Sequence, residues 1–148
     1  MLTAVVAVLG TLAGSLLTGI LQHFSQRAQR SAAEATARRA DGMLAVTDLA
    51  AALADHHRAM WLREDLRLLG EDWTQERAAS HITRSAITGP LMRVRIRLPA
   101  LTPAAQTAVA AVYALRNTES DTALRAAREH AIRTADDLIT AAGTALAA

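Results

Sequence analysis

Four arginines between residues 84 and 97 have the residue type and spacing that best fit a binding chemistry. Arg84, Arg93, Arg95 and Arg97 lie in a stretch that contains no Asp or Glu. Guanidinium groups bind phosphates, so this run predicts contact with nucleic acid or anionic lipid. The alternative is a solvated face that pairs with acidic residues elsewhere in the domain. The run has no interleaved aromatic residue, which argues against a site for single-stranded nucleic acid.

Histidines and paired carboxylates, which could carry catalysis, form no catalytic pattern in this chain. His56 and His57 are neighbours, so on a helix they point about 100° apart and cannot clamp one metal ion together. Asp136 and Asp137 diverge for the same reason. The chain has no Cys, which excludes a thiolate zinc site and a Cys nucleophile. We therefore expect no enzyme activity, cofactor, metal or small-molecule substrate.

The N-terminal segment has the composition of a membrane span. Residues 1–26 contain no Asp, Glu, Lys or Arg, and about 20 apolar residues in a helix cross a bilayer. A cleavable signal peptide is one alternative, but its basic residues would precede the apolar run, whereas here they follow it. A buried helix of a soluble protein is the other. We predict a transmembrane helix over residues 1–24.

Basic residues after this segment predict its orientation. Arg27, Arg30, Arg38 and Arg39 face only one acid, Glu34, across residues 27–40. Arginines flanking a span favour the cytoplasmic side. We therefore expect a single-pass protein of the cytoplasmic membrane with its N-terminus outside. Residues 25–148 would form a cytoplasmic helical domain.

Small residues at helical spacing line the expected span. Such residues let two helices approach closely, and in lipid this close contact drives association, although small residues are also common in membrane helices generally. They form two adjacent ridges: Gly10, Gly14 and Thr18, and beside them Thr11, Ser15 and Gly19. We predict self-association into a homo-oligomer through these residues.

The rest of the chain reads as helices separated by turns. Acids spaced by seven from Glu34 to Asp55 lie opposite an apolar face that includes Met43, Leu49 and His57. His57 either packs on Trp61 or acts as a titrating switch.

Turn residues then divide the chain. Gly70 ends the long helix, Asp72 starts a helix to about Leu98, Thr102-Pro103 starts another, and Thr118 or Ser120 caps the last. Gly89-Pro90 would kink or interrupt the second helix. Residues 92–98 also alternate as a strand would, although a lone strand has no partner and helix is favoured. The predicted fold is all-α: a long N-terminal helix, membrane span continuing into a cytoplasmic helix, packed with a small antiparallel helical bundle.

Three stretches resemble the KilB-type plasmid spread and transfer proteins of Streptomyces and related actinobacteria. They are Val-Leu-Gly-Thr-Leu-Ala-Gly at residues 8–14, Asp-His-His-Arg-Ala-Met-Trp at residues 55–61, and Ser-His-Ile-Thr-Arg-Ser-Ala-Ile-Thr-Gly-Pro-Leu at residues 80–91. The resemblance implies a membrane-associated role in plasmid spread, and it carries over no catalytic residue.

Residue pattern and resemblance together favour a scaffold or channel component that self-associates in the membrane. A membrane-disrupting pore former is an alternative that uses the same apolar helix. A helical filament is another, in which the N-terminal helices bury against each other instead of in lipid.

Overall fold

The computed structural model describes the backbone of residues 2–147 and the side chains of residues 22, 23 and 25–147. Its elements in chain order are α1 (Leu2–Leu69), α2 (Thr74–Arg97), the 3-10 helix η1 (Pro99–Leu101), α3 (Thr102–Tyr113) and α4 (Asp121–Ala147). Over these residues the chain forms helices and turns without a strand. The predicted all-α class is confirmed, and residues 92–97 are helical.

The chain divides into two compact units, Met1–Arg39 and Ala40–Ala148. In the first unit every described side chain is exposed. The division predicted from the sequence, 1–24 and 25–148, follows the expected membrane boundary, and that boundary stays a prediction.

No helix in the part of the chain that the structure describes is long and apolar enough to cross a membrane. The span predicted at residues 1–24 falls almost entirely on side chains outside the described part. The same holds for the six small residues of the two predicted ridges: Gly10, Gly14, Thr18, Thr11, Ser15 and Gly19. The span and the ridges therefore stay predictions.

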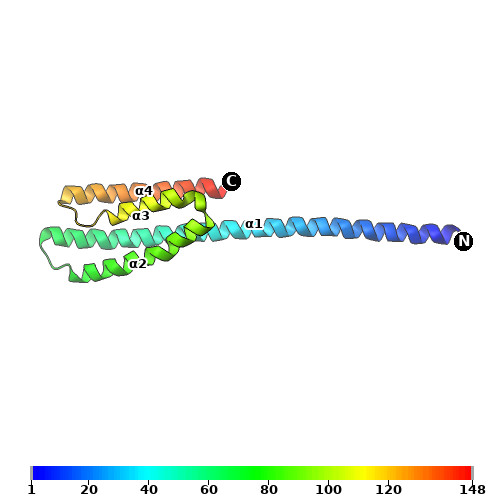
Figure 1. The fold of residues 1–148 in the computed structure, drawn as a ribbon, viewed down its shortest axis with the longest axis horizontal. Helices are drawn as coiled ribbons and strands as arrows, with labels where there is room; N and C mark the ends of the chain where they lie inside the picture. Colours follow the sequence, from blue (N-terminus) through cyan, green and yellow to red (C-terminus); the bar gives the residue numbers. More distant parts are fainter. Residues whose placement is uncertain (1, 148) are drawn as a thin grey trace. The chain divides into compact units, whose positions relative to one another are not determined.

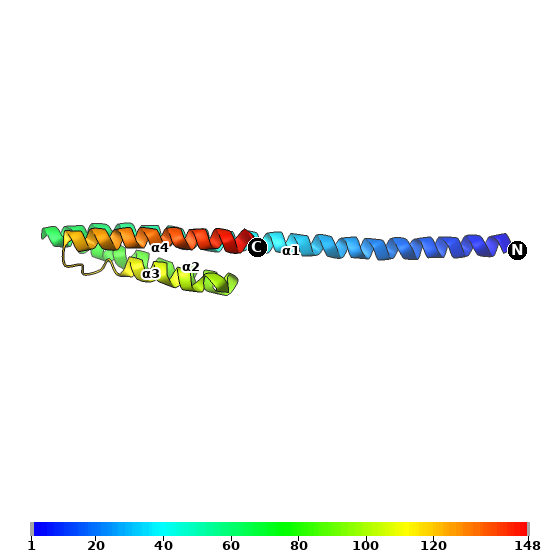
Figure 2. The same ribbon diagram turned by 90° about the horizontal axis from the view of Figure 1, so that it is seen from above.

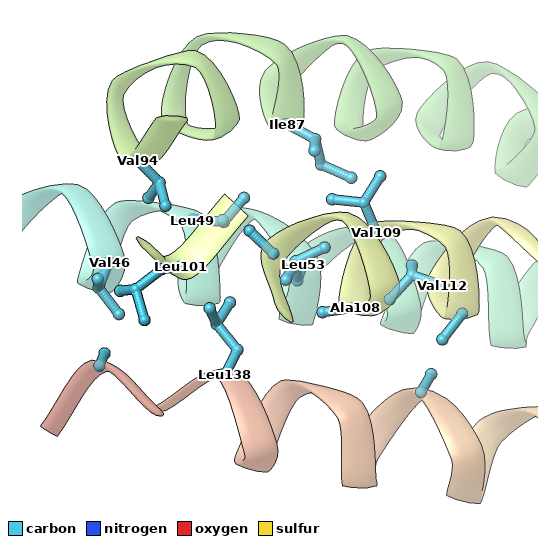
Figure 3. Packing of buried hydrophobic residues seen from close by; sticks show 14 of the residues in the cluster. Val46, Leu49, Leu53, Ile87, Val94, Leu101, Ala108, Val109, Val112 and Leu138 are labelled. Atoms are coloured by element: carbon cyan, nitrogen blue, oxygen red, sulfur yellow. The ribbon is translucent and has the colours of Figure 1, made fainter. Parts of the chain in front are cut away.

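The second unit is an antiparallel bundle of the later part of α1 with α2, α3 and α4. Each helix runs opposite to the one before it, as both views show (Figure 1, Figure 2). Buried side chains from all these helices and from η1 point toward one another (Figure 3). The largest fully buried apolar side chains are Leu49, Leu53, Ile87, Leu115, Leu124, Leu138, Val94 and Val112. The predicted small antiparallel bundle is thus present.

The buried face of α1 is rotated slightly from the predicted one. Ala45 and His56 are buried, whereas Met43 is 61% exposed and His57 is only partly buried. The seven-residue spacing predicts that His57 faces the core. Instead His56 does, because it contacts Thr83 on α2 and Tyr113 on α3. A fixed repeat cannot resolve this difference, because neighbouring positions lie only about 100° apart.

Turn residues end the helices mostly as predicted. Gly70 has φ +74°, and the N–H of Glu71 donates to the carbonyl of Leu66 at 3.0 Å, which is how a left-handed residue closes a helix. Ser120 caps α4 by accepting from the N–H of Ala123 at 3.1 Å. Three details differ. Helix α2 is not interrupted at Pro90, and α3 begins at Thr102 after the turn of η1, without a side-chain cap. Helix α2 begins at Thr74 with Trp73 at the N-cap position, although Oδ1 of Asp72 still accepts from the N–H of Thr74 at 3.0 Å.

Candidate functional site

Four arginines converge on a cavity of about 230 Å³ in the bundle. They come from three parts of the chain: Arg63 from α1, Arg77 and Arg84 from α2, and Arg116 from the turn after α3. The other lining residues are His56, Met60, Trp73, Ser80, His81, Tyr113 and Asn117. None of the lining residues is acidic, so the cavity carries concentrated positive charge.

Helical spacing explains why these residues meet. On α1, His56, Met60 and Arg63 follow at intervals of four and three, which keeps them on one face. On α2, Arg77 and Arg84 are seven residues apart, nearly two turns. The antiparallel packing of α1 and α2 then turns both faces toward the end of α3.

Aromatic rings hold three of the guanidinium groups. The Cζ atom of Arg84 lies 4.0 Å from the centroid of the Tyr113 ring. The Cζ atoms of Arg63 and Arg77 lie 5.1 and 5.7 Å from the centroid of the Trp73 ring. Such cation–π contacts position a guanidinium group without using its N–H donors. Arg63 does use one donor, since its Nη1 donates to Sδ of Met60 at 3.8 Å.

A buried carboxylate organises the inner end of this cluster. Glu64 is fully buried, its Oε2 accepts from Nε of Arg67 at 2.6 Å, and its Oε1 lies 3.6 Å from Nε of Arg63. Arg67 also donates to the carbonyl of Thr118, which ties the end of α1 to the loop before α4. Glu64 therefore balances charge at Arg63 and Arg67.

Arg63 itself keeps unused hydrogen-bonding capacity. It is 7% exposed, and its Nε has no hydrogen-bond partner within the described part of the chain. Burial lowers the pKa of Arg63, the carboxylate of Glu64 raises it, and the nearby charges of Arg116, Arg77 and Arg67 lower it. Because an arginine side chain stays charged in proteins, this environment would favour an added anion.

His56 presents a neutral ring nitrogen to the cavity. Oγ1 of Thr83 lies 2.9 Å from Nδ1 of His56 and 3.2 Å from the carbonyl oxygens of Ala79 and Ser80. The buried Nε2 has no partner among the described residues, and it donates or accepts according to the tautomer of the ring. Burial lowers the pKa of His56 to about 4, and the charge of Arg84 contributes.

The predicted run of arginines divides between two environments. Arg84 lines the cavity, whereas Nη1 of Arg93 lies 2.8 Å from Oδ2 of Asp48 and Nη1 of Arg97 lies 3.8 Å from Oδ2 of Asp41. Arg95 is exposed. The structure does not gather the four residues into one site, and the contact of this run with nucleic acid or anionic lipid stays a prediction.

The four arginines of the predicted membrane flank lie on an exposed stretch of α1. Arg27, Arg30, Arg38 and Arg39 are all exposed. Nη1 of Arg38 lies 3.6 Å from Oε2 of Glu34, one helical turn away. Exposed pairs of this kind contribute little stability, so these arginines remain able to meet another charged surface.

Sequence reasoning missed three of the four cavity arginines. Arg63, Arg77 and Arg116 lie outside the charge run and come from separate elements. The spacing of Arg77 and Arg84 was the available signal, since both fall on one face of a helix. Nothing in the sequence indicated that Arg63 and Arg116 would join them.

Comparison with known proteins points to one family. The family model for the KilB plasmid transfer protein matches residues 43–146. Protein KilB from Streptomyces lividans is 49% identical over 145 residues, which cover 96% of each chain. No solved structure matches the chain. The resemblance seen in the sequence is confirmed.

Proposed function

The chain belongs to the KilB plasmid transfer protein family, and from this we propose that it acts in plasmid transfer as a single-pass, self-associating membrane protein. Its bundle would lie in the cytoplasm and serve as a scaffold or channel component. The proposal includes no enzymatic step, cofactor or small-molecule substrate. Its partners would be membrane lipid and further copies of the chain, with nucleic acid as a secondary contact of the arginine run.

One observation carries the membrane part of this proposal. Residues 1–26 contain no Asp, Glu, Lys or Arg, and four arginines follow within residues 27–40. Those arginines are exposed, so they can reach the headgroups of anionic lipids. The order of apolar segment and basic flank supports an N-terminus outside the cell.

Self-association is supported by the small residues within that segment. Gly10 and Gly14 lie four residues apart, a spacing that lets two membrane helices approach closely. Association in the membrane would gather several bundles at one place. That arrangement suits either a scaffold or a channel component.

The lack of Cys makes the proposed topology directly testable. Single thiols introduced by Thr3→Cys and Ala148→Cys would be labelled with a membrane-impermeant maleimide in intact cells. We expect labelling of Thr3→Cys from outside and of Ala148→Cys only after permeabilisation. The unmodified chain is the control, and labelling of both positions in intact cells would contradict the orientation.

Two further measurements separate the proposal from its alternatives. Release of the protein by alkaline carbonate, together with ordered fibres by microscopy, would contradict the lipid-embedded helix and indicate a filament. Leakage of dye from liposomes on addition of residues 1–30 would indicate a pore former. Retention in the carbonate pellet without leakage is the result expected here.

A further inference from the structure

We propose that the arginine-lined cavity of the bundle binds the phosphate group of a small phosphorylated molecule from solution. The site lies within Ala40–Ala148 and concerns a ligand that the proposed transfer function does not include. The sequence predicted no small-molecule substrate, and the ligand inferred here is bound without being converted. Three observations carry the inference.

The first observation is the balance of charge around the cavity. Of its four arginines, only Arg63 lies near a carboxylate, Glu64, which it shares with Arg67. Over the described residues, Arg77, Arg84 and Arg116 form no ion pair with an acid. Three positive charges therefore face the cavity uncompensated, and a phosphate would neutralise them through charge-assisted hydrogen bonds.

The second observation is that the site is preorganised. The rings of Trp73 and Tyr113 hold three guanidinium groups by their faces, which leaves the N–H edges available. Arg77 and Arg84 are exposed side chains, and contact with a ring limits their conformations, so binding spends less energy on ordering them. Planar arginine groups also match the geometry of phosphate oxygens better than an ammonium would.

The third observation is the buried, unpartnered polar atoms at the inner wall. Nε2 of His56 is buried without a partner among the described residues, whereas the other unpartnered nitrogen, Nε of Arg63, already faces Oε1 of Glu64 at 3.6 Å. A buried polar atom without a partner is costly, so each such atom in a native fold calls for an explanation. A monohydrogen phosphate or a phosphate ester with a hydroxyl group would give Nε2 of His56 a hydrogen-bond partner, and its anionic oxygens would accept from the cavity arginines.

Size and depth favour a small ligand over a nucleic acid backbone. Sites for drug-sized ligands span roughly 300–1,000 Å³, and this cavity of about 230 Å³ is smaller. Arg63 and His56 are 7% and 1% exposed, so a phosphate on a rigid duplex would not reach them. A compact molecule carrying one phosphate can enter.

Calorimetric titration of the full chain in detergent tests the proposal, with inorganic phosphate and glycerol 3-phosphate as probes at constant ionic strength. We expect saturable binding of both. Arg84→Gln and Arg116→Gln should each weaken it by about tenfold or more, since a hydrogen bond to a charged group contributes roughly 1.5–3 kcal/mol. Arg133→Gln is the control, because Arg133 is an exposed arginine of α4 that lies outside both the cavity and the arginine run.

The variants are chosen so that loss of fold cannot imitate loss of binding. Arg84 and Arg116 are exposed residues, and thermal melting followed by circular dichroism checks each variant. Equal phosphate affinity in wild type, Arg84→Gln and Arg116→Gln would overturn the proposal. So would the absence of any binding of the two probes.

Further titrations distinguish a small soluble phosphate from a lipid headgroup and from DNA. A short DNA duplex would be titrated under the same conditions, and vesicles of phosphatidylglycerol and of phosphatidylcholine would be mixed with the chain after the detergent is removed. Binding to duplex or anionic vesicles that Arg84→Gln and Arg116→Gln abolish, without binding of the soluble probes, would overturn the assignment to a small molecule. Binding of the soluble probes alone supports it.

Discussion

Oδ2 of Asp48 on α1 lies 2.8 Å from Nη1 of Arg93 on α2. This pair, together with the longer contact of Asp41 and Arg97, joins two antiparallel helices through charges that the sequence analysis treated separately. The sequence places the acids spaced by seven opposite an apolar face, and it predicts that the arginine run either binds phosphate or pairs with acids. In the bundle, two members of each set face one another.

Asp48→Asn should lower the free energy of unfolding by only about 0.5 kcal/mol, because the pair is partly exposed and solvent screens it. Urea unfolding of Asp48→Asn, Arg93→Gln and the double variant measures the coupling between the two residues. Arg95→Gln serves as the exposed control. A coupling energy above about 2 kcal/mol would mean that the pair is far better shielded than its exposure indicates.

Glu64→Gln should be strongly destabilising, by about 3–5 kcal/mol, because it removes the buried negative charge that faces Arg63 and Arg67. Glu71→Gln is the matched control, since Glu71 is exposed in the turn after α1. Chemical denaturation of both variants gives the comparison. Similar stabilities for the two would show that Glu64 does not balance the inner arginines.

Acid should destabilise the bundle through His56. Its pKa is about 4 in the folded chain and about 6.5 when unfolded, so below pH 6.5 the unfolded state binds more protons. Stability is therefore full above about pH 6.5 and falls as pH decreases toward 4, by up to about 3 kcal/mol.

Unfolding measured from pH 7 to 5 in wild type and His56→Gln checks this dependence. Subtracting the pH dependence of His56→Gln from that of wild type gives the contribution of His56 alone. His57 contributes to both proteins, and its pKa is also lowered by burial and by Arg128. A slope that is the same in both proteins would rule out the contribution of His56.

Leu138→Ala should cost about 2–5 kcal/mol, because Leu138 is fully buried against the other helices (Figure 3). Ile139→Ala removes a branched side chain at the next position, where the residue is 51% exposed. We expect its effect to be below about 1 kcal/mol. Thermal melting of the two variants tests the predicted orientation of α4, and equal losses would contradict it.

Gly14→Ile should weaken association of the N-terminal helix in a membrane dimerisation assay. A branched side chain at the centre of the predicted ridge would keep two backbones apart. Leu16→Ile is the control, since Leu16 lies on neither ridge. Association that is unchanged by Gly14→Ile would remove the ridge as its basis.

Helix boundaries and the apolar face of α4 could be predicted from local patterns. Gly70 and Ser120 act through their own backbone and side-chain chemistry, which neighbouring residues alone determine. Leu124 and Leu138 fall on the buried side because spacing along one helix fixes its faces. Residues 92–97 were ambiguous by pattern, and the bundle provides helical neighbours but no strand partner over the described residues.

The cavity could not be predicted, because its members are distant in the sequence. Arg63 meets Arg116 only after α1 and α3 pack together. The choice of His56 over His57 for the core depends likewise on a rotation of α1 set by its neighbours. Such relationships belong to tertiary packing, and periodicity within one helix carries no information about them.

Gly42 lies close to the last turn of α4 at the opposite end of the bundle. A Cβ atom there would come within 2.9 Å of Cδ2 of Leu146, so the start of the bundle and the end of α4 lie against each other. The arginines gather near the other end, where Arg67 meets Thr118. A reporter protein fused to the C-terminus would thus be attached far from the cavity. The two ends of the bundle can be altered independently, one by engineering the fusion junction and the other by changing its charges.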